Sequence, residues 1–118
     1  MRFEKFLQPD NLKAALKILK TDSNSVILGG TTFLRLSDKK YSTGIDLSNL
    51  DLDYIKENND QIEIGAYTHL RTIETNPIIN KYFGDLLPKS LENLIGIQFR
   101  NNATIGGAIF GRLGFTEI

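Results

Sequence analysis

A short apolar run that stops at two adjacent glycines is the feature that most limits how this chain can fold. The run covers residues 26–28 (Val-Ile-Leu), and the glycines are Gly29 and Gly30. A short β-prone run that ends at glycine is typical of a buried strand followed by a tight turn. We predict that a helix begins after this turn, at Thr31 or Thr32.

A glycine turn between a strand and a helix can bind an anion. Glycine lets a ligand approach the backbone, and the first N–H groups of a helix lack internal partners and carry partial positive charge. A phosphate or pyrophosphate would fit at Gly29–Gly30, with the hydroxyls of Thr31 and Thr32 as further donors. A plain tight turn explains the two glycines equally well. The pattern matches neither the P-loop nor the Rossmann fingerprint.

A second glycine pair, Gly106–Gly107, follows Thr104 and the pair Arg100–Asn101. Bare backbone at these glycines would let a planar ring or a phosphate lie against the main chain, with Thr104 as a polar tether. The alternative is a β-bulge or a crowded strand crossing. Helical periodicity ends at Gly96, so we predict loop and short strand for residues 103–109.

The rest of the pattern predicts alternating helices and strands. The polar turn at residues 58–60 is the expected boundary between two subdomains. The remaining predicted elements are a helix over residues 12–19, strands at residues 44–47 and 61–66, a short helix capped by Thr68 and ending near Thr75, and a helix from Asp85 or Pro88 to Ile95.

Composition excludes several classes of function. Lys plus Arg and Asp plus Glu both total 14 in 118 residues, so the zero net charge does not favour nucleic acid or membrane as a partner. Because the chain has no cysteine, it forms no disulfide and offers no thiolate to an iron–sulfur cluster. Any redox chemistry must therefore use a borrowed cofactor. No apolar run is long enough for a signal peptide or a membrane span, so we expect a cytoplasmic location.

No catalytic residue and no metal site are predicted. His69 is the only histidine, and a solvent-facing position near a helix start is expected for it. Asp46, Asp51 and Asp53 lack the glycine and distal glutamate of an EF-hand, so a solvated loop is expected there.

Several segments, in order along the chain, resemble the FAD-binding domain of the molybdopterin dehydrogenase family. This family includes the medium flavoprotein subunits or domains of xanthine and carbon monoxide dehydrogenases. The segments that carry the resemblance are residues 3–7, 11–20, 29–31, 45–48 and 64–70, Ile73–Glu74, Arg100–Asn101 and residues 103–107.

The resemblance implies an α/β (α+β) fold, namely the bilobed PCMH-type FAD-binding domain. A small α/β subdomain would cover residues 1–58, a second and incomplete subdomain would cover residues 59–118, and FAD would lie between them. The resemblance assigns cofactor binding to Leu28, Gly29, Gly30, Thr31, Thr32, Phe33 and Leu34 on one side, and to Ala103, Thr104, Gly106, Gly107, Thr116 and Glu117 on the other.

The sequence departs from the family at three places. Ala108 stands where the family usually has asparagine, and Glu117 stands where it usually has aspartate. Family domains also continue well beyond the length of this chain, so we expect a C-terminal truncation. A sheet without its later strands leaves unpaired edges, and we expect self-association through such an edge.

The resemblance implies a flavoprotein module of a molybdenum-hydroxylase-type oxidoreductase. FAD would relay electrons from iron–sulfur centres to an acceptor such as NAD, and the partners would be an iron–sulfur subunit and a molybdopterin-binding subunit. One alternative is a truncated, non-enzymatic domain that keeps the fold or the partner surface without stable FAD binding. Another is an unrelated small α/β protein that binds a phosphorylated metabolite at Gly29–Gly30.

Overall fold

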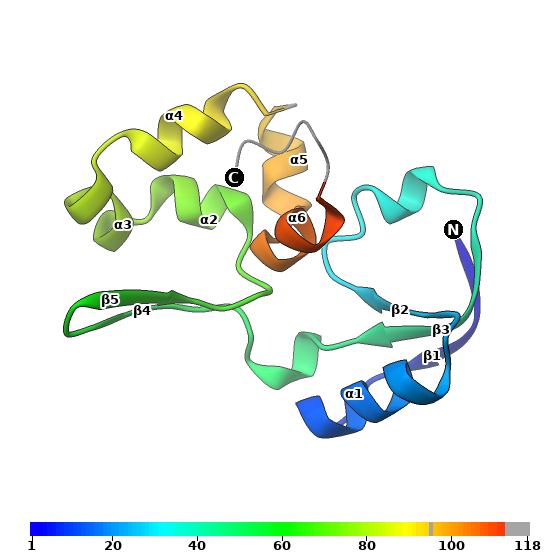
Figure 1. Ribbon diagram of the computed structural model, residues 1–118. Coiled ribbons are helices and arrows are strands. Elements are labelled where there is room, and N and C mark those ends of the chain that lie inside the picture. The colour runs from blue at the N-terminus through cyan, green and yellow to red at the C-terminus, as the bar shows by residue number, and fades with distance from the viewer. Residues whose placement is uncertain (95, 113–118) are drawn as a thin grey trace.

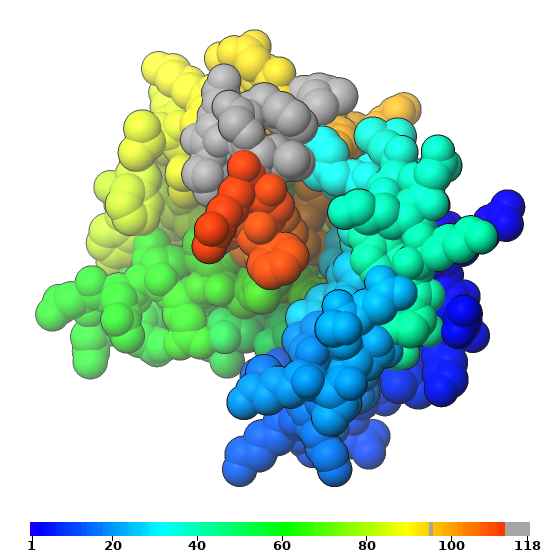
Figure 2. Space-filling view, turned by 45° about the vertical axis from the view of Figure 1, so that its right-hand side comes forward, coloured from blue at the N-terminus to red at the C-terminus, as the bar shows by residue number. Residues whose placement is uncertain are grey.

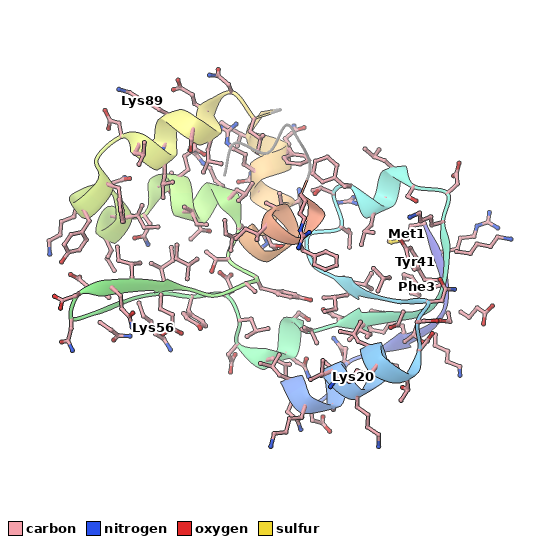
Figure 3. All side chains as sticks on the ribbon, in the orientation of Figure 1. Met1, Phe3, Lys20, Tyr41, Lys56 and Lys89 are labelled. Atoms are coloured by element: carbon pink, nitrogen blue, oxygen red, sulfur yellow. The ribbon has the colours of Figure 1, made fainter. Side chains whose placement is uncertain are left out.

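The computed structural model describes residues 1–94 and 96–112 and places them in two lobes (Figure 1). The first lobe contains a three-stranded parallel sheet in the order β1–β3–β2, so the third strand in sequence lies in the middle. Its strands are β1 (Arg2–Leu7), β2 (Ser25–Leu28) and β3 (Lys40–Asp46). Phe3 on β1 is the register partner of Tyr41 on β3, and both lie at the same end of the sheet (Figure 3).

Helix α1 (Leu12–Thr21) covers one face of this sheet, as the periodicity of its apolar residues predicts (Figure 1). It begins at Asn11, whose side-chain oxygen accepts a hydrogen bond of 2.9 Å from the backbone N–H of Ala14. Ala15 is buried on the inner face and shares a core with Ile45 and Leu47. The first lobe therefore has two crossover connections, one from β1 through α1 to β2 and one from β2 to its parallel neighbour β3.

The prediction of a helix that begins after Gly30 is wrong. Thr31 has a φ of 54°, in the left-handed region, and a right-handed helix cannot pass through such a residue. Only a single 3₁₀ turn, η1 (Leu34–Leu36), forms before β3. The backbone between Leu28 and Leu34 is consequently an irregular loop.

The second lobe packs five short helices against one hairpin (Figure 1). Its core contains Leu70, Ile73, Ile79 and Leu91, each at most 1% exposed. The elements are β4 (Ile55–Asn58), β5 (Gln61–Ile64), α2 (Leu70–Thr75), α3 (Pro77–Phe83), α4 (Leu86–Glu92), α5 (Ile97–Asn102) and α6 (Ile105–Gly111), and a second 3₁₀ turn, η2 (Ser48–Leu50), precedes them.

The polar residues before position 60 form strand β4, which sequence periodicity did not predict. Residues 59–60, within the predicted turn at residues 58–60, are the turn of the antiparallel β4–β5 hairpin, and Asn59 has a φ of 46° there. Ile55 on β4 packs against the core of the second lobe, whereas Leu52 packs against the core of the first. Hydrophobic packing therefore changes lobe just before β4. The subdomain division at residue 58 stays a prediction.

Residues 97–111 form helices α5 and α6, so the loop and short strand expected from residue 103 onward are wrong. Glycine costs about 1 kcal/mol relative to alanine inside a helix, which makes Gly106 and Gly107 poor signals for one. Burial of Ile105 and Ala108 on one helical face offsets this cost. Thr104 caps α6 by accepting a 3.3 Å hydrogen bond from the N–H of Gly107.

Two predicted helices are present, each with one altered boundary. Helix α2 ends at Thr75 as predicted, but Thr68 does not cap it. The Thr68 hydroxyl instead exchanges hydrogen bonds with both backbone groups of Tyr54, at 3.0 and 3.1 Å. Helix α4 begins directly after Asp85, as predicted, but ends at Glu92, before the expected end. Within residues 1–94 and 96–112, no helix has the length and apolar character required to cross a membrane.

Candidate functional site

The two glycine-containing segments, far apart in sequence, lie against each other between the lobes. A Cβ atom built on Gly30 would lie 1.7 Å from the carbonyl oxygen of Asn102, and one built on Gly29 would lie 2.9 Å from the hydroxyl oxygen of Thr104. Neither position has room for a side chain. We call this contact between residues 29–30 and residues 102–104 the glycine junction.

Close approach, and not positive φ, explains the first glycine pair. Within the described residues, the glycines with positive φ are Gly84 and Gly96, so Gly29 and Gly30 adopt conformations open to other residues. The left-handed residue of this loop is Thr31. The simple-turn interpretation is therefore incomplete, because the bare backbone is required by packing against the second lobe.

The loop after β2 presents free hydrogen-bond donors. In the part of the chain that the structure describes, the backbone N–H groups of Gly30, Thr31 and Thr32 donate no hydrogen bond. All three residues are partly exposed. Consecutive N–H groups around a left-handed residue form a concave site that favours anions. The loop therefore has the donors that a phosphate or pyrophosphate requires, although no helix follows it.

A short segment, residues 65–70, holds the second glycine pair in place, and we call it the strap. Three backbone hydrogen bonds of 2.9 Å join it to the start of α6 and the residue before: Leu70 N–H to Ala103 O, Ile105 N–H to Thr68 O, and Gly106 N–H to Ala66 O. A Cβ at Gly106 would lie 2.7 Å from the Ala66 oxygen, so glycine is required there too.

The strap also reaches the first lobe through Tyr67. Its hydroxyl donates a 2.6 Å hydrogen bond to the carbonyl of Leu28 and accepts one of 3.0 Å from the N–H of Leu47. Burial raises the pKa of the Tyr67 phenol, so it stays protonated and able to donate across the physiological range. One side chain thus connects both strand ends of the first lobe to the segment that supports Gly106.

Aromatic contact closes the junction on another side. Phe33 in the loop after β2 meets Phe99 on α5 edge to face, with ring centroids 5.2 Å apart and an interplanar angle of 69°. Sequence reasoning assigned Phe99 only to the core. It could not identify this pair, because the two residues lie on separate lobes.

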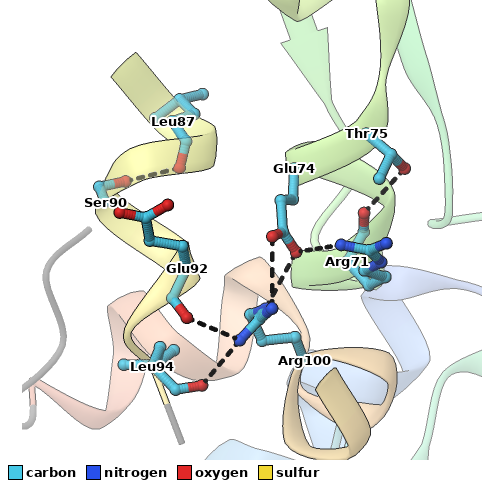
Figure 4. A network of polar contacts seen from close by, with 8 residues as sticks. All are labelled: Arg71, Glu74, Thr75, Leu87, Ser90, Glu92, Leu94 and Arg100. Atoms are coloured by element: carbon cyan, nitrogen blue, oxygen red, sulfur yellow. Dashed lines mark hydrogen bonds and ion pairs between the residues drawn. The ribbon is translucent and has the colours of Figure 1, made fainter. Parts of the chain in front are cut away.

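Beneath the junction, Arg100 of α5 makes a buried ion pair (Figure 4). Its guanidinium donates to both carboxylate oxygens of Glu74 on α2, at 2.9 and 3.3 Å, and to the carbonyls of Glu92 and Leu94. The side chains of Arg100 and Glu74 are only 5% and 10% exposed. Burial raises the pKa of Glu74, but hydrogen bonds from Arg71 and Arg100 outweigh it and hold that pKa below its ordinary value.

The end of α6 forms one wall of a hollow of about 520 Å³ lined by Gly106, Ile109, Phe110 and Arg112. In Figure 2 this end of the helix, in red, stands beside the blue and cyan surface of the first lobe. Ile109 and Phe110 are 61% and 88% exposed. The hollow is thus apolar, with one cationic side chain at its edge.

The structure brings part of the predicted site together. Gly29 and Gly30 meet Ala103 and Thr104 at the glycine junction, whereas Gly106 and Gly107 face Ala66 and Thr104 within the second lobe. Thr116 and Glu117 lie outside the described residues. Ala108, which stands where the family usually has asparagine, is 7% exposed and belongs to the core of the second lobe. Sequence reasoning missed Tyr67, whose lone aromatic ring carries no recognisable pattern.

Other polar residues do not build a second centre. Asp53 lies 3.8 Å from His69 in a pair that is about half exposed. Among the described residues, no group of three or more His, Cys, Asp or Glu side chains has an arrangement suited to a metal ion.

Comparison with known proteins identifies the family to which the chain is similar. The model of the FAD binding domain in molybdopterin dehydrogenase matches residues 1–113. The glyceraldehyde dehydrogenase medium chain of Sulfolobus acidocaldarius is 30% identical over 110 residues, which are 88% of this chain and 38% of that protein. The nicotinate dehydrogenase FAD-subunit of Eubacterium barkeri is 32% identical over 114 residues, 91% of this chain and 38% of that protein.

Solved structures agree with these relatives. Carbon monoxide dehydrogenase from Hydrogenophaga pseudoflava is similar with a TM-score of 0.81 and 27% identity, over 92% of this chain and 39% of that chain. Quinoline 2-oxidoreductase from Pseudomonas putida 86 gives a TM-score of 0.79 and 25% identity, over 91% and 39%. The chain therefore spans about two-fifths of the length of these proteins.

These findings confirm the expected family, the mixed α/β fold and FAD as the cofactor. The individual site residues stay predictions. The chain belongs to the family of FAD-binding domains in molybdopterin dehydrogenases.

Proposed function

We propose that this chain is the FAD-holding module of a molybdenum-hydroxylase-type oxidoreductase. FAD, when bound, accepts and passes on electrons, and the protein positions it. The observation that carries the proposal is the glycine junction, where Gly29 and Gly30 pack closely against the other lobe beside free N–H donors. No residue of the chain is required as an acid, base or nucleophile for this function.

The residues at the junction fit the parts of FAD. The N–H groups of Gly30, Thr31 and Thr32 would hold the pyrophosphate, because they are exposed donors without internal partners. The backbone of Gly106 and Gly107 would let the cofactor lie close to the second lobe. Thr104 is only 4% exposed and already caps α6, so its hydroxyl would act mainly by shaping this backbone.

The proposal extends to partners and location. Relatives are named as a medium chain and as an FAD-subunit, which supports membership in an assembly of several chains. We propose an iron–sulfur subunit as electron donor, a molybdopterin-binding subunit as the site of substrate oxidation, and an acceptor such as NAD. A cytoplasmic location is part of the same proposal.

Titration of the purified chain with flavins tests the proposal. We expect saturable FAD binding that quenches flavin fluorescence, with ADP competing and riboflavin binding much more weakly, because the free donors suit a pyrophosphate. Equal affinity for FAD and riboflavin would contradict the proposed pyrophosphate contact. Failure to bind FAD under any condition would favour the alternative of a non-enzymatic domain that keeps the family fold.

A further inference from the structure

One hydroxyl group joins the ends of strands β2 and β3. The parallel pairing of these strands ends with Leu28 opposite Asp46. Leu47, the residue after β3, donates its N–H to the Tyr67 hydroxyl at 3.0 Å, and this hydroxyl donates to the Leu28 carbonyl at 2.6 Å. The phenol oxygen thus bridges two backbone groups at the point where the two strands end.

The point of separation coincides with the start of the anion loop. Leu28 immediately precedes Gly29, and the free N–H donors begin at Gly30. Ligands of parallel α/β sheets bind beyond the carboxyl ends of the strands, where neighbouring strands diverge. A group that binds the carbonyl of the last residue of β2 therefore helps to fix the direction in which the following backbone leaves the sheet.

Tyr67 belongs to the strap, which fixes its backbone to the second lobe on both sides. Ala66 accepts the N–H of Gly106, and Thr68 accepts the N–H of Ile105, each at 2.9 Å. Tyr67 therefore links the position of the loop after Leu28 to the position of the segment that contains Gly106. Leu28 and Leu47 are 8% and 5% exposed, so water does not readily replace the hydroxyl at these backbone groups.

We propose that Tyr67 is a positioning residue for the cofactor site: its hydroxyl bridges the ends of β2 and β3 and so holds the N–H donors of residues 30–32 in place for the anion. This proposal rests on the proposed function for the identity of the anion, the pyrophosphate of FAD. Without the hydroxyl, the N–H of Leu47 loses its acceptor and the carbonyl of Leu28 loses this donor, so the loop after Leu28 is held less firmly.

Tyr67→Phe tests the hydroxyl bridge between Leu28 and Leu47, with Tyr54→Phe as the matched control. Tyr54 also donates a 2.6 Å hydrogen bond, to Glu63, but does so on the exposed β4–β5 hairpin. We expect the FAD dissociation constant to rise about tenfold in Tyr67→Phe, the effect of losing one to two hydrogen bonds, and to stay within twofold in Tyr54→Phe. A Tyr67→Phe protein that binds FAD as tightly as wild type would overturn the proposal.

Amide hydrogen exchange provides a second measurement that needs no cofactor. In Tyr67→Phe, we expect altered exchange at Leu47 and at residues 29–32, and unchanged exchange in the core of the second lobe. A merely structural effect would change protection throughout the molecule, and either that result or unchanged exchange at these amides would overturn the proposal. If wild-type protein bound no FAD, the proposed function would fail, and the exchange pattern would still decide whether Tyr67 orients the loop.

Discussion

Replacement of Gly30 by alanine is the sharpest test of the glycine junction. The added Cβ would lie 1.7 Å from the carbonyl oxygen of Asn102, and it would also meet backbone atoms at 2.7 and 3.1 Å. Real Cβ contacts stay above 3.0 Å, so the two segments must move apart by about 1.3 Å. Because the opposing atoms are all backbone, no side chain can rotate away to relieve the clash.

We expect Gly30→Ala to lower the free energy of unfolding by about 3 kcal/mol, the upper end for overpacking. For a chain of this size, that loss corresponds to a fall of about 10 °C in Tm. Urea denaturation and thermal melts followed by circular dichroism measure both quantities. FAD affinity is expected to fall at least tenfold as well, because the displaced segment carries the free N–H donors.

Gly107→Ala is the matched control. Its Cβ would meet only the Thr104 hydroxyl, at 3.1 Å, and alanine gains up to about 1 kcal/mol over glycine inside a helix. We expect its stability to stay within about 1 kcal/mol of wild type. A Gly30→Ala protein as stable as Gly107→Ala would refute the close contact between the lobes.

Three further substitutions probe the support around the junction. Glu74→Gln should cost about 2 kcal/mol at pH 7 in urea denaturation, because Arg100 keeps its buried charge with a neutral partner; an unchanged midpoint would contradict this. The pKa of Glu74 in the folded protein lies below its ordinary value of 4.5. The stability that its charge contributes is therefore complete above about pH 4.5 and is lost as pH falls through the folded pKa. In thermal melts across that range, Glu74→Gln should lose less stability with falling pH than wild type does. Arg100→Lys should also cost about 2 kcal/mol in melting experiments, because an ammonium cannot match four planar contacts. Ala108→Asn should lose about 2 kcal/mol without tighter FAD binding in flavin titration, because position 108 faces the core; a gain in affinity would place it at the cofactor.

The periodicity of apolar residues was sufficient to predict elements that bury one face. Helix α1 and strand β2 follow directly from their apolar spacing. Strand β4 was not predicted because three of its four residues are exposed and only Ile55 is partly buried. It is stabilised by pairing with β5, which local periodicity does not show.

Long-range contact decided what local patterns could not. The sequence marks Gly106 and Gly107 as breakers of regular structure, yet they lie inside α6, since the helix must approach the backbone of Ala66. Thr31 is an unremarkable residue by propensity, but its left-handed conformation replaces the expected helix. The two glycine segments were predicted to share a ligand from their resemblance to one family. Residues 64–70 belong to the same resemblance, but the contacts by which Tyr67 and the strap join the two lobes were not predicted.

The strap also bears on how such a chain can reach its native contacts. Gly30 and Asn102 touch across 72 positions of sequence, a loop whose direct closure is slow because so many conformations must be lost. Tyr67 bonds to Leu28 across 39 positions, and Ala66 bonds to Gly106 across 40. Docking of the strap onto either lobe thus divides one long search into two searches of about half its span.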